Sequence, residues 1–170
     1  EDYTVNLLSN TYAGTGNASV QAQIVPTNAN YSGGVPVNVT INVTIPASVP
    51  GDQPAAVAFG GGYTANGIAN VSFPSWAFDI RSDSGAWGSP NRFGTFYTLF
   101  PYQRNSTSHD SSILIANATA VSAYLDALEL AVAQNPALAE RIDPTQAVTK
   151  GFSIGGKNAF VAAVFDERVK

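Results

Sequence analysis

Apolar and polar residues alternate strictly along residues 35–45, and this is the most regular pattern in the chain. One side of the segment is aliphatic and the other carries Pro, Asn and Thr, which predicts a half-buried antiparallel strand. A shorter alternating segment at residues 19–25 predicts its partner, with a polar turn region at residues 27–34 between the two. The aliphatic side consists of Val35, Val37, Val39, Ile41, Val43 and Ile45.

The apolar pattern then changes. Residues 54–59 form a continuous run of small apolar side chains, which predicts a strand buried on both faces, and residues 67–73 predict the next strand. Residues 74–111 are rich in aromatic side chains and predict an ordered loop. An apolar stripe at helical spacing then predicts a helix that ends before Asn135-Pro136. The stripe consists of Leu114, Val121, Leu125, Leu128 and Val132.

The last part of the chain predicts one more strand and one more helix. Asp143-Pro144 is expected to turn the chain into a strand at residues 145–152. Residues 154–165 then carry Ala159, Phe160, Ala163 and Val164 at helical spacing. This order of elements predicts one α/β-hydrolase-like three-layer sandwich, in which antiparallel strands lead into a parallel sheet with helices on both faces.

The junction between this strand and this helix carries the pentapeptide Gly151-Phe152-Ser153-Ile154-Gly155. A G-x-S-x-G sequence at a strand-to-helix turn is typical of an esterase nucleophile, because glycines at 151 and 155 allow close packing while the serine hydroxyl projects outward. The alternative is a structural tight turn that happens to contain serine. In the catalytic interpretation, the backbone amides of Ile154, Gly60 and Gly61 are candidates to hold the oxyanion. The glycine run at 60–62 is otherwise a plain turn after a buried strand.

Four co-linear segments resemble the fungal and bacterial glucuronoyl esterases of the α/β-hydrolase superfamily, over about residues 35–170. Residues 151–159 are similar to that family's G-C-S-R-N-G-K-G-A nucleophile segment. Residues 94–100, 126–129 and 142–145 resemble its G-x-F-Y-x-L-Y, I-D-A-L-E and I-D-T-T segments. The resemblance implies a secreted ester hydrolase that cleaves glucuronate esters of plant cell-wall polysaccharide, with Ser153 as nucleophile and Lys157 contacting sugar hydroxyls. A lysine one turn into the helix offers three donors near the serine, although it is equally consistent with a solvated side chain.

Two positions depart from the family pattern. Ile154 stands where the family has arginine, and losing one oxyanion donor typically lowers the rate by a factor of about 10² to 10³. Phe152 replaces a cysteine, in keeping with the absence of cysteine throughout. Two alternatives therefore stay open, namely a general carboxylesterase of other specificity and an extracellular glycoprotein that has kept the fold and lost the chemistry.

Serine needs a base and an orienting carboxylate, and this segment does not supply them in the expected order. The single histidine, His109, precedes Ser153, whereas hydrolases of this type place the histidine after the serine. His109 is better interpreted as a loop-packing or capping residue. We therefore expect residues 1–170 to be the N-terminal part of one domain, with the acid and the histidine on a further segment or second chain. The acid pairs Asp126/Glu129 and Asp166/Glu167 are expected to be solvated.

The amino-acid composition limits the partners and bound groups that we expect for this protein. The net charge is −4 and no basic block is present, so neither nucleic acid nor an anionic membrane is an expected partner. No cofactor or metal is expected from a chain without cysteine and with a single histidine. The absence of methionine suggests that a leader was removed before Glu1.

The sequons support export. Seven of the 14 asparagines head an N-x-S/T triplet, against about two expected from the Ser and Thr content. This excess predicts a secreted protein that carries N-linked glycans. Candidate acceptors are Asn17, Asn30, Asn38, Asn42, Asn70 and Asn105, whereas Asn117 lies beside the helical stripe and is a poorer candidate.

Overall fold

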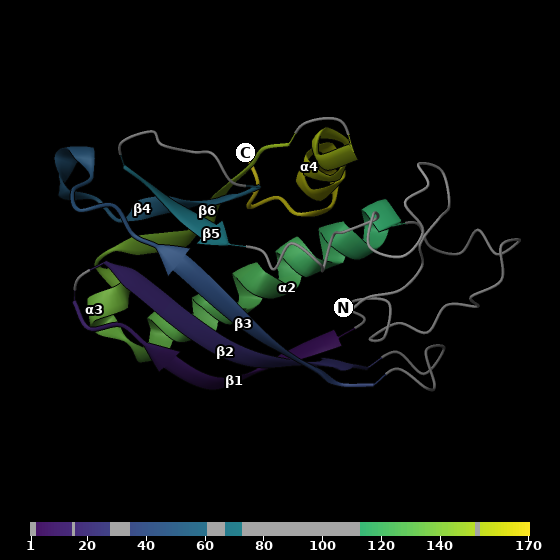
Figure 1. Cartoon of the computed structure of the whole chain (residues 1–170), viewed down its shortest axis with the longest axis horizontal. Helices are drawn as coiled ribbons and strands as arrows, with labels where there is room; N and C mark the ends of the chain where they lie inside the picture. The colour runs from purple at the N-terminus through teal and green to yellow at the C-terminus, as the bar shows by residue number, and fades with distance from the viewer. Residues whose placement is uncertain (1–2, 15, 28–34, 61–66, 73–112, 152–153) are drawn as a thin grey trace, which may run out of the picture.

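The structure is a computed structural model that describes residues 3–14, 16–27, 35–60, 67–72, 113–151 and 154–170. It contains one six-stranded mixed sheet in the order β1-β2-β3-β5-β4-β6, with two longer helices packed beside it (Figure 1). The strands are β1 (Tyr3–Thr11), β2 (Asn17–Pro26), β3 (Val37–Thr44), β4 (Ala55–Phe59), β5 (Ile68–Ser72) and β6 (Ile142–Thr149). The helices are the short 3-10 turn η2 (Pro50–Asp52), then α2 (Ile113–Gln134), α3 (Pro136–Ala139) and α4 (Ile154–Phe165).

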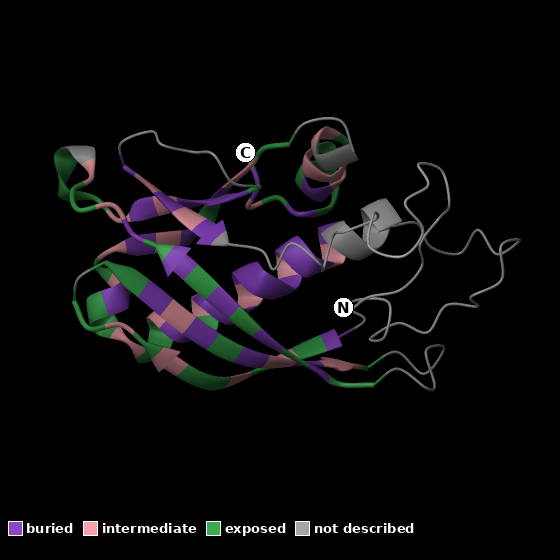
Figure 2. Ribbon diagram, in the orientation of Figure 1, coloured by how far each residue is buried: buried purple, intermediate pink, exposed green. Residues whose placement is uncertain are grey.

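The predicted alternating strands form the antiparallel half of the sheet. β3 pairs with β2 along eight residues of each strand, and every second side chain of β3 is buried while its neighbours are exposed (Figure 2). Val35 does not belong to this buried face, because it precedes β3 and is 54% exposed. Strand β1, which the sequence analysis did not identify, pairs antiparallel with the outer edge of β2. Its apolar residues are interrupted by a bulge between Leu7 and Ser9, which weakens the alternation that would have revealed it.

The sheet becomes parallel at β4. This strand pairs in parallel with β5 on one side and with β6 on the other, and four of its five residues are buried. A central strand is covered on both faces, so the continuous apolar run at residues 54–59 predicted its position correctly.

The turn expected at Asp143-Pro144 lies inside β6, which begins earlier than predicted. The register between β4 and β6 steps from Ala56 opposite Asp143 to Val57 opposite Ala147, so the residues between them bulge out of the ladder. The Asp143 carboxylate holds this bulge by accepting hydrogen bonds from the Thr145 amide at 3.0 Å and the Thr145 hydroxyl at 2.6 Å. A bulge also explains how a proline is tolerated in the strand.

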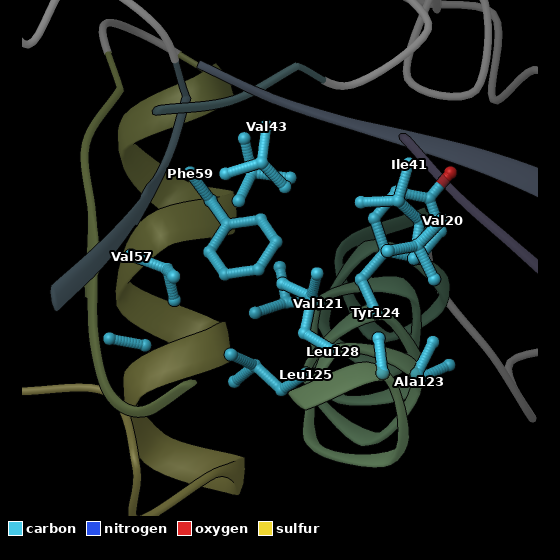
Figure 3. Packing of buried hydrophobic residues seen from close by; sticks show 14 of the residues in the cluster. Val20, Ile41, Val43, Val57, Phe59, Val121, Ala123, Tyr124, Leu125 and Leu128 are labelled. Atoms are coloured by element: carbon cyan, nitrogen blue, oxygen red, sulfur yellow. The ribbon is translucent and has the colours of Figure 1, made fainter. Parts of the chain in front are cut away.

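The predicted amphipathic helix is α2, and it closes the core. Leu125 and Leu128 are fully buried and Val121 nearly so, whereas Val132 is half-buried. Figure 3 shows Phe59 of β4 pointing into the space between α2 and α4, beside residues of both sheet halves. Burial raises the pKa of Tyr124, on the same helix, to about 12.

Helix α4 has the predicted bounds. It packs against α2 and β6 with Ala162 buried, whereas Phe160 and Val164, two of the residues at helical spacing, are 71% and 62% exposed. Ala163 is also exposed and Ala159 is only partly buried. The helix is apolar nearly all round, so spacing alone did not determine its inner side. Because α4 packs against α2 and both contact β6, the two helices share one face of the sheet. The described residues therefore show helical cover on that face alone.

Some predictions lie outside the described residues, namely the turn at 28–34 and the aromatic-rich segment at 73–112. None of the described helices combines the length and apolarity needed to cross a bilayer.

Candidate active site

The carboxyl ends of β4 and β6 bring two candidate segments together. The Lys150 amide, just after β6, donates a 3.0 Å hydrogen bond to the carbonyl of Phe59, the last residue of β4. The glycine run at 60–62 follows Phe59 in the sequence, and the G-x-S-x-G segment follows Lys150. Ligands of open α/β sheets bind at this edge, beyond the carboxyl ends of the parallel strands.

Gly60 is required where these two segments meet. Its φ is +106°, a conformation that side-chain-bearing residues rarely adopt, and a Cβ placed on it would overlap the carbonyl oxygen of Lys150. The same Cβ would lie only 2.9 Å from the Lys150 carbonyl carbon. The glycine therefore allows the backbone after β4 to pass directly against the backbone that leads to the serine. Gly61 lies outside the described residues.

The segment that carries the serine joins β6 to α4, as the sequence predicted. Ser153 and Phe152 themselves lie outside the described residues, but the chain on one side is a strand and on the other a helix. A Cβ on Gly156 would lie 3.3 Å from the Gly151 carbonyl oxygen, so the start of α4 approaches the end of the strand closely. Gly156, next to the predicted pair Gly151 and Gly155, therefore takes part in the close approach. The Thr149 hydroxyl reinforces the junction by donating to the Ala159 carbonyl at 3.0 Å.

The start of α4 presents the other candidate groups. Ile154 is the first residue of the helix, so its backbone amide belongs to the end where helix N–H groups lack intrahelical partners. Lys157 lies one turn further and is exposed, and it has no ion-pair partner among the described residues. Helix N-termini favour developing negative charge, which is the property an oxyanion site needs.

Asn158, beside Lys157, was not singled out by the sequence. Its side-chain oxygen is buried and accepts no hydrogen bond within the described part of the chain. A buried amide oxygen normally has a donor, and none of the described residues supplies one here. An asparagine inside an otherwise apolar helix was the available signal.

A second polar cluster lies away from this edge and contains three of the four acids that were expected to be solvated; Asp166 is buried and Asp126 and Glu129 are partly buried, whereas Glu167 is exposed as expected. Arg168 bonds to Asp126 at 2.8 Å, to Glu129 at 3.0 Å and to Asp166 at 2.7 Å. The Tyr3 hydroxyl donates to Asp126 at 2.7 Å, so the cluster joins β1, α2 and the segment after α4. Asp126 and Glu129 look solvated in sequence because their cation, Arg168, comes from a distant position in the chain.

Burial and pairing act in opposite directions on the charges of this cluster. Burial by itself raises the pKa of Asp166, but hydrogen bonds from Arg168 and from Ser122 outweigh it, and the net pKa is lowered. The hydrogen bond to Asp166, opposed by burial and aided by Glu129 and Asp126, raises the pKa of Arg168. Asp166 and Arg168 are therefore both charged at neutral pH.

The candidate glycosylation sites differ in their exposure to solvent. Asn17, Asn38 and Asn42 are exposed on the antiparallel half of the sheet, whereas Asn70 lies on β5 inside the sheet with its side-chain oxygen buried. His109, Asn30 and Asn105 lie outside the described residues. Within the described ranges, no group of three His, Cys, Asp or Glu side chains is arranged to hold a metal.

Comparison with known proteins places this geometry in a family. The family model described as glucuronyl esterase, fungi, matches residues 29–170. The chain belongs to the fungal glucuronyl esterase family. It is 34% identical over 142 residues to the 4-O-methyl-glucuronoyl methylesterase of Podospora anserina, covering 81% of this chain and 26% of that protein. It is 32% identical over 118 residues to the enzyme of the same name from Hypocrea jecorina, covering 68% of this chain and 22% of that protein.

Solved structures agree on the fold. The glucuronoyl esterase catalytic domain from Hypocrea jecorina superposes with a TM-score of 0.63 at 26% identity, covering 96% of this chain and 39% of that one. A glucuronoyl esterase from Teredinibacter turnerae gives a TM-score of 0.54 at 19% identity, over 99% of this chain and 44% of its own, and supports the fold alone. These glucuronoyl esterase folds agree with the α/β-hydrolase class predicted from the order of elements. The chain thus spans about a quarter of the curated relatives and about two fifths of the solved catalytic domains.

Proposed function

We propose that this chain supplies the nucleophile-bearing part of a secreted serine ester hydrolase that cleaves glucuronate esters of plant cell-wall polysaccharide. The observation that carries the proposal is the junction of two backbones at the carboxyl edge of the parallel sheet, where Gly60 packs on Lys150 just before the G-x-S-x-G segment. The names of the relatives, 4-O-methyl-glucuronoyl methylesterases, support the same reaction class.

In this mechanism, the Ser153 hydroxyl attacks the carbonyl carbon of the ester and loses its proton to a base. The amide of Ile154, at the start of α4, donates to the oxyanion together with an amide from the glycine run at 60–62. The tetrahedral intermediate expels the alcohol, which takes up a proton, and water then hydrolyses the acyl-serine to release the glucuronate. Lys157, exposed one turn along α4, would donate to hydroxyls of the sugar ring.

The base and its orienting acid are proposed to come from polypeptide beyond the segment described here. The relatives are about four times longer than the part that this chain matches, which leaves ample length for both groups. A histidine after the serine in chain order would follow the pattern of the superfamily.

A serine-directed phosphonate probe tests the nucleophile. Protein expressed from the complete gene should be labelled, and so should the control variant Ser48→Ala, which alters an exposed serine far along the chain. Ser153→Ala should not be labelled. Before treatment with the probe, the protein should hydrolyse glucuronate benzyl ester in preference to p-nitrophenyl acetate, and labelling should abolish this activity. Labelling that survives Ser153→Ala would exclude this residue as the nucleophile.

Export and glycosylation form a separate part of the proposal. Asn17, Asn38 and Asn42 are exposed and can accept a glycan, whereas the buried side-chain oxygen of Asn70 disfavours one. Peptide mapping of the secreted protein after treatment with peptide N-glycosidase should show deamidation at the exposed sites and none at Asn70. A secreted protein with all three exposed sites unmodified would contradict this part.

A further inference from the structure

The two sequons at residues 17–19 and 42–44 face each other in the sheet. In the antiparallel pairing of β2 with β3, Asn17 lies opposite Thr44 and Ser19 lies opposite Asn42. Each acceptor asparagine is therefore the cross-strand partner of the hydroxyl residue that completes the other sequon. Partners of this kind have Cα atoms about 4.5–5.5 Å apart. Asn17, Asn42 and Thr44 are exposed, so the two sequons form one patch on the outer face of the antiparallel half.

The two sequons differ in the number of strands that hold them. Asn42 and Thr44 belong to β3, which at these residues pairs with β2 on one side and with β5 on the other. Asn17 pairs with β3 alone, because the register between β1 and β2 ends at Thr11 opposite Ser19. The backbone of Asn17 therefore enters a ladder only after β3 has been made, whereas β2 already exists when Asn42 is made.

Attachment of an N-linked glycan needs a sequon whose backbone is not paired. In the transfer, Nδ2 of the asparagine forms a bond to the anomeric carbon of a lipid-linked oligosaccharide and loses a proton, while the lipid pyrophosphate leaves with the electron pair of the broken bond. The transferring enzyme must bind the backbone of all three sequon residues. In the finished sheet the backbone of Asn42 and Thr44 is paired with β2 and β5, and opening a central strand costs nearly the free energy of global unfolding. An exposed side chain leaves room for the glycan, but the transfer itself has to precede pairing.

The order of synthesis determines how long each sequon stays unpaired. Asn42 follows Asn17 by 25 residues, which at about 5–20 residues per second takes roughly 1–5 s. A β-hairpin forms in about 1–10 μs. Asn17 is therefore open for seconds, whereas β3 can pair as soon as it emerges, and it adds the third strand that a small sheet needs for stability. Asn38, which pairs with Gln23 of β2, is limited in the same way as Asn42.

We propose that the pairing of β3 with β2 limits glycan attachment to β3, so that Asn17 is the fully occupied acceptor and Asn38 and Asn42 are modified in a minority of molecules. The inference rests on the export part of the proposed function, because the sequons must reach the transferring enzyme. It does not depend on the reactivity of Ser153.

Site occupancy measured by mass spectrometry tests the inference. The protein is expressed from its complete gene behind a cleavable secretion leader of the host, so that entry into the secretory pathway does not depend on its own leader. Cellular and secreted protein are pooled, so that variants that fail to fold are still counted. Treatment with peptide N-glycosidase in heavy-oxygen water marks each occupied asparagine. In the wild type, Asn17 should be modified in nearly every molecule and Asn42 in a minority.

Two variants separate strand pairing from general misfolding. Gln21→Pro places a proline in β2, opposite Thr40 of β3, and proline is excluded from central strands, so the pairing should fail. Occupancy at Asn42 should then rise towards that of Asn17. The matched control is Leu128→Pro, which breaks α2 at a fully buried residue made after both strands. Its occupancies should equal those of the wild type.

Three outcomes overturn the proposal. The first is equal occupancy of Asn17 and Asn42 in the wild type, and the second is an unmodified Asn17. The third is a rise at Asn42 in Leu128→Pro as large as in Gln21→Pro, which would show that the completed fold, and not the pairing of β2 with β3, limits the transfer. Expression without the host leader tests export separately, because a failure of export there would contradict the proposed function and leave these occupancies unchanged.

Discussion

At the scale of single residues, the site depends on backbone approaches that only glycine permits. Gly60 combines a positive φ with direct contact to Lys150, whereas Gly14 has a similar φ of +87° but nothing within 4 Å of its would-be Cβ. A side chain at Gly14 would therefore meet conformational strain alone, whereas a side chain at Gly60 would meet both strain and steric overlap. The sequence indicated that the glycine run mattered, but it did not show which glycine lies against which backbone.

Gly60→Ala should lower the free energy of unfolding by about 2–5 kcal/mol, because strain at positive φ and overlap with Lys150 add together. Gly14→Ala should cost only the strain, about 1–2 kcal/mol. Urea unfolding followed by circular dichroism measures both. Equal losses in the two variants would contradict the close approach at Gly60.

The Asp166 carboxylate should make stability depend on pH. Its folded-state pKa is lowered from about 3.8, so its contribution is present above that value and is lost as the pH falls through the folded pKa. Asp166→Asn should cost about 1–3 kcal/mol at pH 7. The difference from the wild type should shrink as the pH falls below 3.8 and through the lowered folded-state pKa, where the Asp166 carboxyl becomes neutral as well.

Urea unfolding at pH 7 and at pH 3 checks this expectation. Glu167→Gln, which alters the exposed neighbour, is the control and should change stability little at either pH. A loss for Asp166→Asn that is the same at both pH values would show that charge does not stabilise the cluster.

At the scale of elements, apolar spacing predicted both α2 and α4, but it indicated the buried side of α2 alone. Helix α2 has one continuous apolar stripe that fits the sheet, so its orientation is fixed by its own sequence. Helix α4 offers apolar side chains on several sides, and contacts with α2 and β6 select Ala162 for the interior. Where a helix is apolar on more than one side, its contacts with neighbouring elements determine which side is buried.

Leu125→Ala should lower the free energy of unfolding by about 2–5 kcal/mol, because Leu125 is fully buried against the sheet. Leu130→Ala, on the same helix with 37% exposure, is the matched control and should cost markedly less. Thermal unfolding of both variants measures the difference. Similar losses would mean that α2 does not present its stripe to the core as described.

At the scale of the whole molecule, the chain joins an antiparallel half to a parallel half within one sheet. The change occurs at β5, because this strand pairs antiparallel with β3 and parallel with β4 (Figure 1). The parallel half carries the glycine junction and the serine-bearing segment. The antiparallel half, with α2 across it, supplies most of the buried core.

The ion pairs of Arg168 with Asp126, Glu129 and Asp166 should control how firmly residues 169 and 170 are held to β6. Arg168→Met removes the cation from three carboxylates and should speed hydrogen exchange at the Lys170 amide, which bonds to Ala147. A local cost of about 2 kcal/mol corresponds to roughly 30-fold faster exchange. Lys157→Met, which removes an exposed cation, should leave the rate unchanged. An unaltered rate in Arg168→Met would show that the hydrogen bond between Lys170 and Ala147 does not depend on the ion pairs of Arg168.

Local patterns by themselves determined most elements of this protein. Strict alternation specified β3, a continuous apolar run specified β4, and a single stripe specified α2, because each pattern reflects one environment. The G-x-S-x-G segment and its flanks indicated a serine hydrolase for the same local reason. Tertiary structure alone decided that β1 closes the antiparallel edge, that Gly60 meets Lys150, and that Arg168 gathers acids from distant positions. Those contacts join residues far apart in the chain, and their energies depend on distances that no local pattern records.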